Sequence, residues 1–139
     1  MKAYIINLFV TLIGIASQQI PDWNKTTNWN LYDTGGKKNL SMPLDSVLLC
    51  KSVPLPSDSM HVFLNQLYPW PKGKQYPVWM GAFCGTYEIN SIPHKVDISM
   101  YGGFMYDENT RSYFQLPETI RNEWMDFLNK HSEEFYNSK

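Results

Sequence analysis

The hydrophobic pattern of this chain changes its period near Gly73, and that change constrains the fold most strongly. Residues 95–101 place Val96, Ile98 and Met100 alternately with polar neighbours. Alternation of this kind is typical of a strand that buries one face. The second half of the chain is therefore expected to contain a sheet.

Further strands are predicted around this segment, at residues 28–33, 78–89, 103–106 and 113–116. Turn residues separate the later strands at positions 90–93 and 107–110. The Gly102-Gly103 pair predicts a tight corner where a side chain would not fit. We expect an antiparallel β-meander of three to five strands.

The C-terminal segment carries the clearest helical pattern. Pro117 and Glu118 are typical of a first helical turn. Apolar or amphipathic side chains then recur at spacings of three and four, at Ile120, Trp124, Phe127, Leu128, His131 and Phe135. This predicts a helix of about 15 to 20 residues that packs on the sheet through Trp124.

Two short helices are expected before the sheet, which makes the fold class α+β. The first would span residues 43–53, and the second would follow Ser57, whose side chain can cap a helix. A chain of 139 residues has room for one core, so we expect a single monomeric domain. The net charge of −1 excludes a basic domain, which argues against nucleic-acid binding.

The N-terminus resembles an export signal. Lys2 precedes a mostly apolar run, and Gly14 and Ala16 provide small residues at the two positions that a signal peptidase reads. We therefore predict a signal peptide at 1–16, a domain at 17–139, and a secreted or periplasmic location. The run is shorter than the about 20 apolar residues that span a bilayer, so the protein is not expected to cross a membrane. The alternative is a buried N-terminal strand or helix.

The two cysteines, Cys50 and Cys84, are candidates for one disulfide in an exported protein. The alternative is a pair of separate buried thiols, because each cysteine follows apolar residues. The spacing of the cysteines and of the three histidines fits no zinc motif, and no metal or cofactor is expected.

Catalytic motifs are not evident, and no residue is assigned a catalytic role. The sequence lacks a nucleophile-elbow pattern and a Cys in a catalytic signature. Cys84 and His94 form the best remaining pair, since a turn near residues 90–93 would place them on adjacent strands.

Amphipathic aromatic residues in polar or proline-rich surroundings are the best binding candidates, namely Trp29, Trp70, Tyr76 and Trp79. The alternative is that these rings cap the ends of the core. We favour a small exported, non-enzymatic binding protein, inhibitor- or immunity-like, that acts on an envelope or extracellular protein. The alternative function is a small envelope hydrolase that uses Cys84 or a carboxylate.

Overall fold

The computed structural model describes residues 20–34, 42–71, 73–75, 82–99 and 101–137. The predicted signal peptide, residues 1–16, lies outside the described residues. Strands and helices follow in the order η1 (Trp23–Lys25), β1 (Thr27–Asp33), α2 (Leu44–Val47), β2 (Lys51–Pro54), α3 (Ser57–Leu64), β3 (Tyr68–Pro69), β4 (Ala82–Ile89), β5 (Ile92–Ser99), β6 (Phe104–Asp107), β7 (Ser112–Gln115), η3 (Glu118–Ile120), α4 (Arg121–Ser132) and α5 (Glu134–Asn137).

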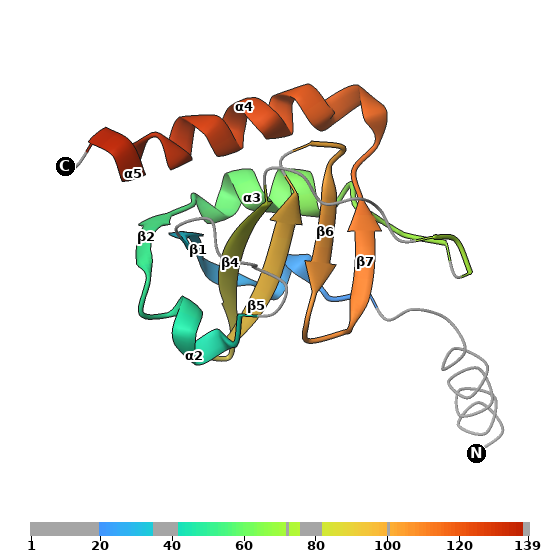
Figure 1. The fold of residues 1–139 in the computed structure, drawn as a ribbon. Helices are drawn as coiled ribbons and strands as arrows, with labels where there is room; N and C mark the ends of the chain where they lie inside the picture. The colour runs from blue at the N-terminus through green and yellow to red at the C-terminus, as the bar shows by residue number, and fades with distance from the viewer. Residues whose placement is uncertain (1–19, 35–41, 72, 76–81, 100, 138–139) are drawn as a thin grey trace, which may run out of the picture.

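The strands form one antiparallel sheet of seven strands in the order β2-β1-β4-β5-β6-β7-β3. The α+β class and the C-terminal helix are confirmed, and α4 and α5 run across the top of the sheet in Figure 1. The predicted number of strands was too low. The meander β4–β7 lies in the predicted region, and β1 lies at the strand predicted for residues 28–33. The two strands that were not predicted are β2 and β3, which form the two edges of the sheet.

The first short helix was predicted too long. Instead of extending through residues 43–53, α2 ends at Val47, and residues 51–54 form the edge strand β2. Val53 is buried and pairs with Leu31, so a strand there buries an apolar side chain against β1. The second helix, α3, begins at Ser57 itself, follows Pro56, and has no side-chain cap.

The turn between β4 and β5 is tighter than predicted. Ile89 pairs with Ile92, so only Asn90 and Ser91 lie between the strands. Both residues have positive φ, at 52° and 65°, as a two-residue type I′ hairpin requires. The predicted strand at 78–89 is confirmed from Ala82 onward, and residues 78–81 lie outside the described residues.

The main core lies on the face of the sheet that α3 and α4 cover, which we call the helix face. The strands contribute Trp29, Leu31, Val53, Tyr87, Val96, Ile98, Met105 and Phe114, and α3 and α4 add Met60, Leu64, Trp124 and Leu128. Burying these side chains provides most of the driving force for folding. None of the described helices is both long and apolar enough to cross a membrane.

The glycine corner between β5 and β6 is confirmed. Gly102 and Gly103 both have positive φ, at 80° and 68°. A Cβ atom on Gly103 would lie 3.1 Å from side-chain atoms of Leu116 and Arg121. A larger residue would therefore be strained and crowded at this corner.

Candidate functional site

The opposite face of the sheet carries the polar residues of the strands, and we call it the polar face. Side chains alternate along a strand, so the buried Tyr87, Val96 and Ile98 send their neighbours to the other side. The central part of the polar face of β4 and β5 thus includes Cys84, Thr86, Lys95, Asp97 and Ser99, which are all buried.

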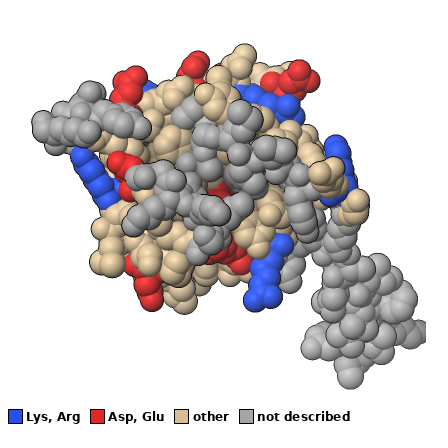
Figure 2. Space-filling model, viewed as in Figure 1, with Lys and Arg blue, Asp and Glu red and all other residues tan. Residues whose placement is uncertain are grey.

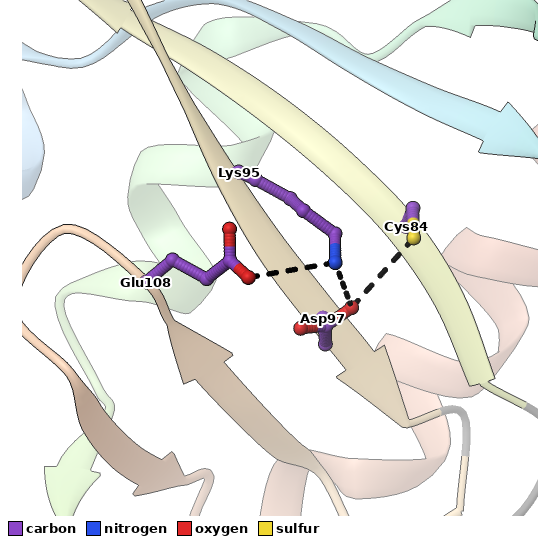
Figure 3. A network of polar contacts seen from close by, with 4 residues as sticks. All are labelled: Cys84, Lys95, Asp97 and Glu108. Carbon is purple, nitrogen blue, oxygen red and sulfur yellow. Dashed lines mark hydrogen bonds and ion pairs between the residues drawn. The ribbon is translucent and has the colours of Figure 1, made fainter. Parts of the chain in front are cut away.

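Four side chains on this face form a polar cluster, shown in Figure 3, in which Cys84, Lys95 and Asp97 are buried and Glu108 is partly exposed. We call it the buried cluster. The Nζ atom of Lys95 lies 3.3 Å from Oδ1 of Asp97 and 3.5 Å from Oε1 of Glu108. The Cys84 thiol donates to the same Oδ1 of Asp97 at 3.6 Å. The cluster therefore joins a thiol, an ammonium group and two carboxylates within hydrogen-bonding range.

The strand register explains why these residues meet. Cys84 of β4 pairs directly with Asp97 of β5, so the two side chains share one face. Lys95 lies two residues before Asp97 and points the same way. Glu108 follows the end of β6, and its backbone N–H donates to the carbonyl of Lys95 at 3.2 Å.

Burial controls the ionisation of this cluster. It raises the pKa of the Cys84 thiol to about 12, and the neighbouring Asp97 carboxylate adds to that shift. Burial also raises the pKa of Asp97 to about 6, although the Lys95 ammonium opposes the increase. At neutral pH Cys84 is therefore a protonated thiol, whereas a cysteine nucleophile acts as the thiolate.

Cys84 and His94 do not form the dyad that the sequence suggested. Cys84 points to the polar face, whereas His94 stacks on Tyr87 of the helix face, with ring centroids 5.3 Å apart. The one-residue offset between His94 and Lys95 decides this, because adjacent strand residues face opposite sides. No general base from this histidine reaches the thiol.

Beside the cluster, the polar face continues as an aromatic surface over β6, β7 and β3. Tyr106 pairs directly with Asp97 on one side and with Tyr113 on the other, so all three share this face. The rings of Tyr106 and Tyr113 lie 4.6 Å apart between centroids, at 40°. Both are half-buried. Burial, with Glu108 second, raises the pKa of Tyr106.

The aromatic surface extends to the edge strand. Phe104 pairs with Gln115 of β7, and Gln115 pairs with Tyr68 of β3. The Tyr68 hydroxyl donates to Oε1 of Gln115 at 2.9 Å, and 40% of Tyr68 is exposed. We define the aromatic surface as Tyr68, Phe104, Tyr106, Tyr113 and Gln115.

Trp70 supports this surface from its edge. Its ring meets that of Phe104 edge-on, with centroids 5.1 Å apart, and Nζ of Lys74 lies 4.4 Å from its ring centroid. Its backbone N–H donates to the carbonyl of Tyr113. Trp70 is buried, so it holds the surface in place more than it offers a ring to a partner.

The other predicted binding residues are not brought together in the described structure. Trp29 is 1% exposed and packs on Tyr87 in the core. Its Nε1 donates to the hydroxyl of Thr26, which leaves no part of the ring to a partner. Tyr76 and Trp79 lie outside the described residues.

The predicted disulfide is wrong, because Cys50 and Cys84 are both free thiols. The Cys50 thiol donates to the carbonyl of Ser46, and the Cys84 thiol to Asp97. Cys50 directly precedes β2, and β1 lies between β2 and β4. Two interstrand spacings are about 9.5 Å, whereas disulfides join Cα atoms less than about 7 Å apart. The thiols are separate, as the alternative predicts, but only Cys84 is buried and Cys50 is half-buried.

The residues that define the polar face are not apparent from the sequence. Its alternating pattern predicts Lys95 and Asp97 at solvent-facing positions of a strand, and it gives no sign of a site at Tyr106 and Tyr113. The spacings Phe104-x-Tyr106 and Tyr113-x-Gln115 contain the signal, since each places two side chains on one face. The pairing register of β6 with β7 then brings these side chains together, and neither segment alone indicates that register.

Comparisons of the chain with models of protein families, with curated proteins and with solved structures give no match. Within the described ranges, no three His, Cys, Asp or Glu residues gather closely enough to hold a metal ion. The proposals below therefore depend on the geometry of the polar face itself.

Proposed function

We propose that the protein is a small exported binding protein, inhibitor- or immunity-like, which contacts an envelope or extracellular protein through its aromatic surface. The contacting, half-buried ring pair of Tyr106 and Tyr113 is the observation that carries this proposal. Tyrosine rings combine a large apolar area with a hydrogen-bonding hydroxyl, and they are enriched in protein interfaces.

The chemistry of the buried cluster supports binding over the alternative of hydrolysis by Cys84 or a carboxylate. Cys84 and Asp97 are 0% exposed, and the thiol is bonded to a carboxylate that raises its pKa further. A hydrolytic nucleophile needs access to substrate and a neighbour that favours the thiolate. Neither condition holds for Cys84 in this arrangement.

The distribution of surface charge also favours recognition of a partner through short-range contacts over long-range electrostatic attraction. In the described part of the face seen in Figure 2, Lys and Arg side chains lie around the rim with Asp and Glu among them. The chain carries a net charge of −1. Mixed signs give little long-range steering, so affinity would come from aromatic and hydrogen-bonding contacts.

A capture experiment tests the proposal. Wild-type protein, a Tyr106→Ala/Tyr113→Ala double variant and a Val62→Ala control would each be immobilised and exposed to envelope and secreted fractions of the host. Val62 is 62% exposed on α3, which covers the helix face. We expect one partner that wild type and Val62→Ala retain equally and that the double variant loses by at least tenfold.

Equal capture by all three proteins, with all three folded by circular dichroism, would contradict a role for the aromatic surface. The export part of the proposal has its own test, which is the N-terminal sequence of the protein in its host. Cleavage after Ala16 leaves a chain that begins at Ser17, whereas an intact Met1 in the cytosol would refute export.

A further inference from the structure

Asp97 and Asp107 are both fully buried aspartates of the sheet, but their carboxylate oxygens differ in the hydrogen bonds that they accept. Oδ1 of Asp107 accepts from the Tyr87 hydroxyl at 2.7 Å, and Oδ2 accepts from the backbone N–H and the hydroxyl of Thr110. Asp97 receives both of its donors, Lys95 and Cys84, on Oδ1. Its Oδ2 atom is buried and has no hydrogen-bond partner among the described residues.

The charges of the cluster around Asp97 do not balance. One ammonium group, on Lys95, lies within 3.5 Å of two carboxylates, on Asp97 and Glu108. With all three groups ionised, the trio carries one surplus negative charge. Glu108 has 38% of its side chain exposed and water can solvate it, whereas the Asp97 side chain is 0% exposed.

We propose that Asp97 is a proton-binding site, at which Oδ2 takes up one proton from solvent in mild acid. The surplus charge of the trio is then removed, and the Lys95 ammonium keeps Glu108 as its counter-ion. A proton on Oδ2 displaces no hydrogen bond from the described part of the chain, because the donors found there, Lys95 and Cys84, both lie on Oδ1. No other bond forms or breaks in this step.

The described elements on either side of Asp97 supply its titratable neighbours. Cys84 faces it from β4, Lys95 from β5, Tyr106 from β6 and Glu108 from the turn after β6. Only Lys95 among them is a cation, and it is shared with Glu108. The remaining neighbours are a thiol, a phenol and a carboxylate, which do not offset the charge of Asp97.

The direction of the pH effect follows from burial. The pKa of Asp97 is raised from its ordinary 3.8 to about 6 in the folded protein, so between these values the folded state binds more protons than the unfolded state. Stability therefore increases as the pH falls through 6, and the gain is complete below about 4. Between pH 7.5 and 4.5 the unfolding equilibrium constant should fall about 25-fold through Asp97 alone.

Two measurements test this site on the intact protein. The first is the side-chain carboxyl ¹³C titration of Asp97, in wild type and in Glu108→Gln. We expect a midpoint near 6 in wild type and a lower midpoint in Glu108→Gln, because the neighbouring negative charge is removed. A purely structural role of Glu108 would not move that midpoint.

The second measurement is chemical unfolding across the same pH range, in wild type, in Asp97→Asn and in Asp126→Asn. Asp126 is exposed on α4 and serves as the control that should keep the wild-type slope. Asp97→Asn mimics the protonated side chain and should lose the 25-fold change. A wild-type Asp97 midpoint below 4.5, or an unchanged slope in Asp97→Asn, would overturn the proposal, and the wild-type titration decides the matter if Asp97→Asn does not fold.

Discussion

Cys84 is the residue whose surroundings most limit the chemistry of the protein. Its thiol is buried in a cluster with Tyr32 and Val47, and it donates a hydrogen bond to Asp97. Each of these contacts favours the neutral thiol, and the pKa of about 12 expresses their combined effect. A substrate or alkylating reagent can reach this sulfur only after local opening of the structure.

Alkylation therefore provides a prediction at the residue scale. In the native protein at pH 8, iodoacetamide should modify Cys84 at least 100-fold more slowly than in the unfolded protein. Cys50, which is half-buried, is the internal control and should react faster than Cys84. Peptide mass spectrometry over time measures both rates. A Cys84 rate close to that of the unfolded chain would contradict this prediction and would favour the alternative of a hydrolase that uses Cys84.

At the same scale, the sequence was informative about which residues are apolar and less informative about buried charges. Trp124 was correctly expected in the core from its helical spacing. Lys95 and Asp97 follow the same alternation as Val96 and Ile98, yet they are buried as well. A pattern that alternates apolar and polar residues predicts that the polar face of the strand is exposed to solvent. In this sheet the polar side chains Lys95 and Asp97 are buried too.

The C-terminal helix shows what a local pattern determines at the scale of an element. The apolar residues Trp124, Leu128 and Phe135 lie on one side of α4 and α5, as their spacing predicts, and all are buried. Trp124 meets the Phe63 ring of α3 edge-on, with centroids 5.0 Å apart. Trp124 thus packs α4 against α3, and it belongs to the core that both helices share with the sheet.

Replacing Trp124 by alanine tests that role. We expect Trp124→Ala to lower the free energy of unfolding by about 3 to 5 kcal/mol, because a large buried side chain leaves a cavity. The indole Nε1 has no hydrogen-bond partner among the residues that the structure describes, so the loss of stability reports packing. Asn122→Ala, at an exposed position of the same helix, should change stability by less than about 0.5 kcal/mol in the same denaturant titration.

A change below about 1 kcal/mol in Trp124→Ala would mean that α4 does not pack as described. Folding of the variant can be followed by near-ultraviolet circular dichroism before unfolding is measured. Tryptophan and asparagine have similar intrinsic helix propensities, so replacing either by alanine changes the propensity of α4 by a similar amount. Comparing the two variants therefore removes the contribution of helix propensity.

Edge strands were the elements that the sequence predicted least well. β2 and β3 contain four and two residues and each includes a proline. Segments this short have too few residues to show a period, and proline argues against a strand except at an edge. Their pairing with β1 and β7 arises from tertiary contacts, which local propensity does not contain.

At the scale of the whole molecule, one sheet separates three environments. The helix face holds the aromatic core, and the polar face is divided into the buried cluster over β4 and β5 and the aromatic surface over β6, β7 and β3. Asp97 and Tyr106 are directly paired across β5 and β6, so the two parts of the polar face are in contact. A change of charge at Asp97 is therefore adjacent to the surface that we propose binds a partner.

The functional candidates were only partly predictable at this scale. Trp70 was singled out from its sequence context, and it does adjoin the aromatic surface through Phe104. Trp29, chosen by the same reasoning, is a core residue. Composition identifies amphipathic rings, but only the packing of strands decides which of them are exposed.

Site-specific photo-crosslinking in the native host tests the central claim most directly. A photoreactive phenylalanine would replace Tyr106 in one strain and Val62 in another, with equal expression of both proteins. We predict one discrete crosslinked partner from position 106 and none from position 62, which lies on α3 over the helix face. The same adducts from both positions, or a crosslink only from position 62, would contradict binding through the aromatic surface.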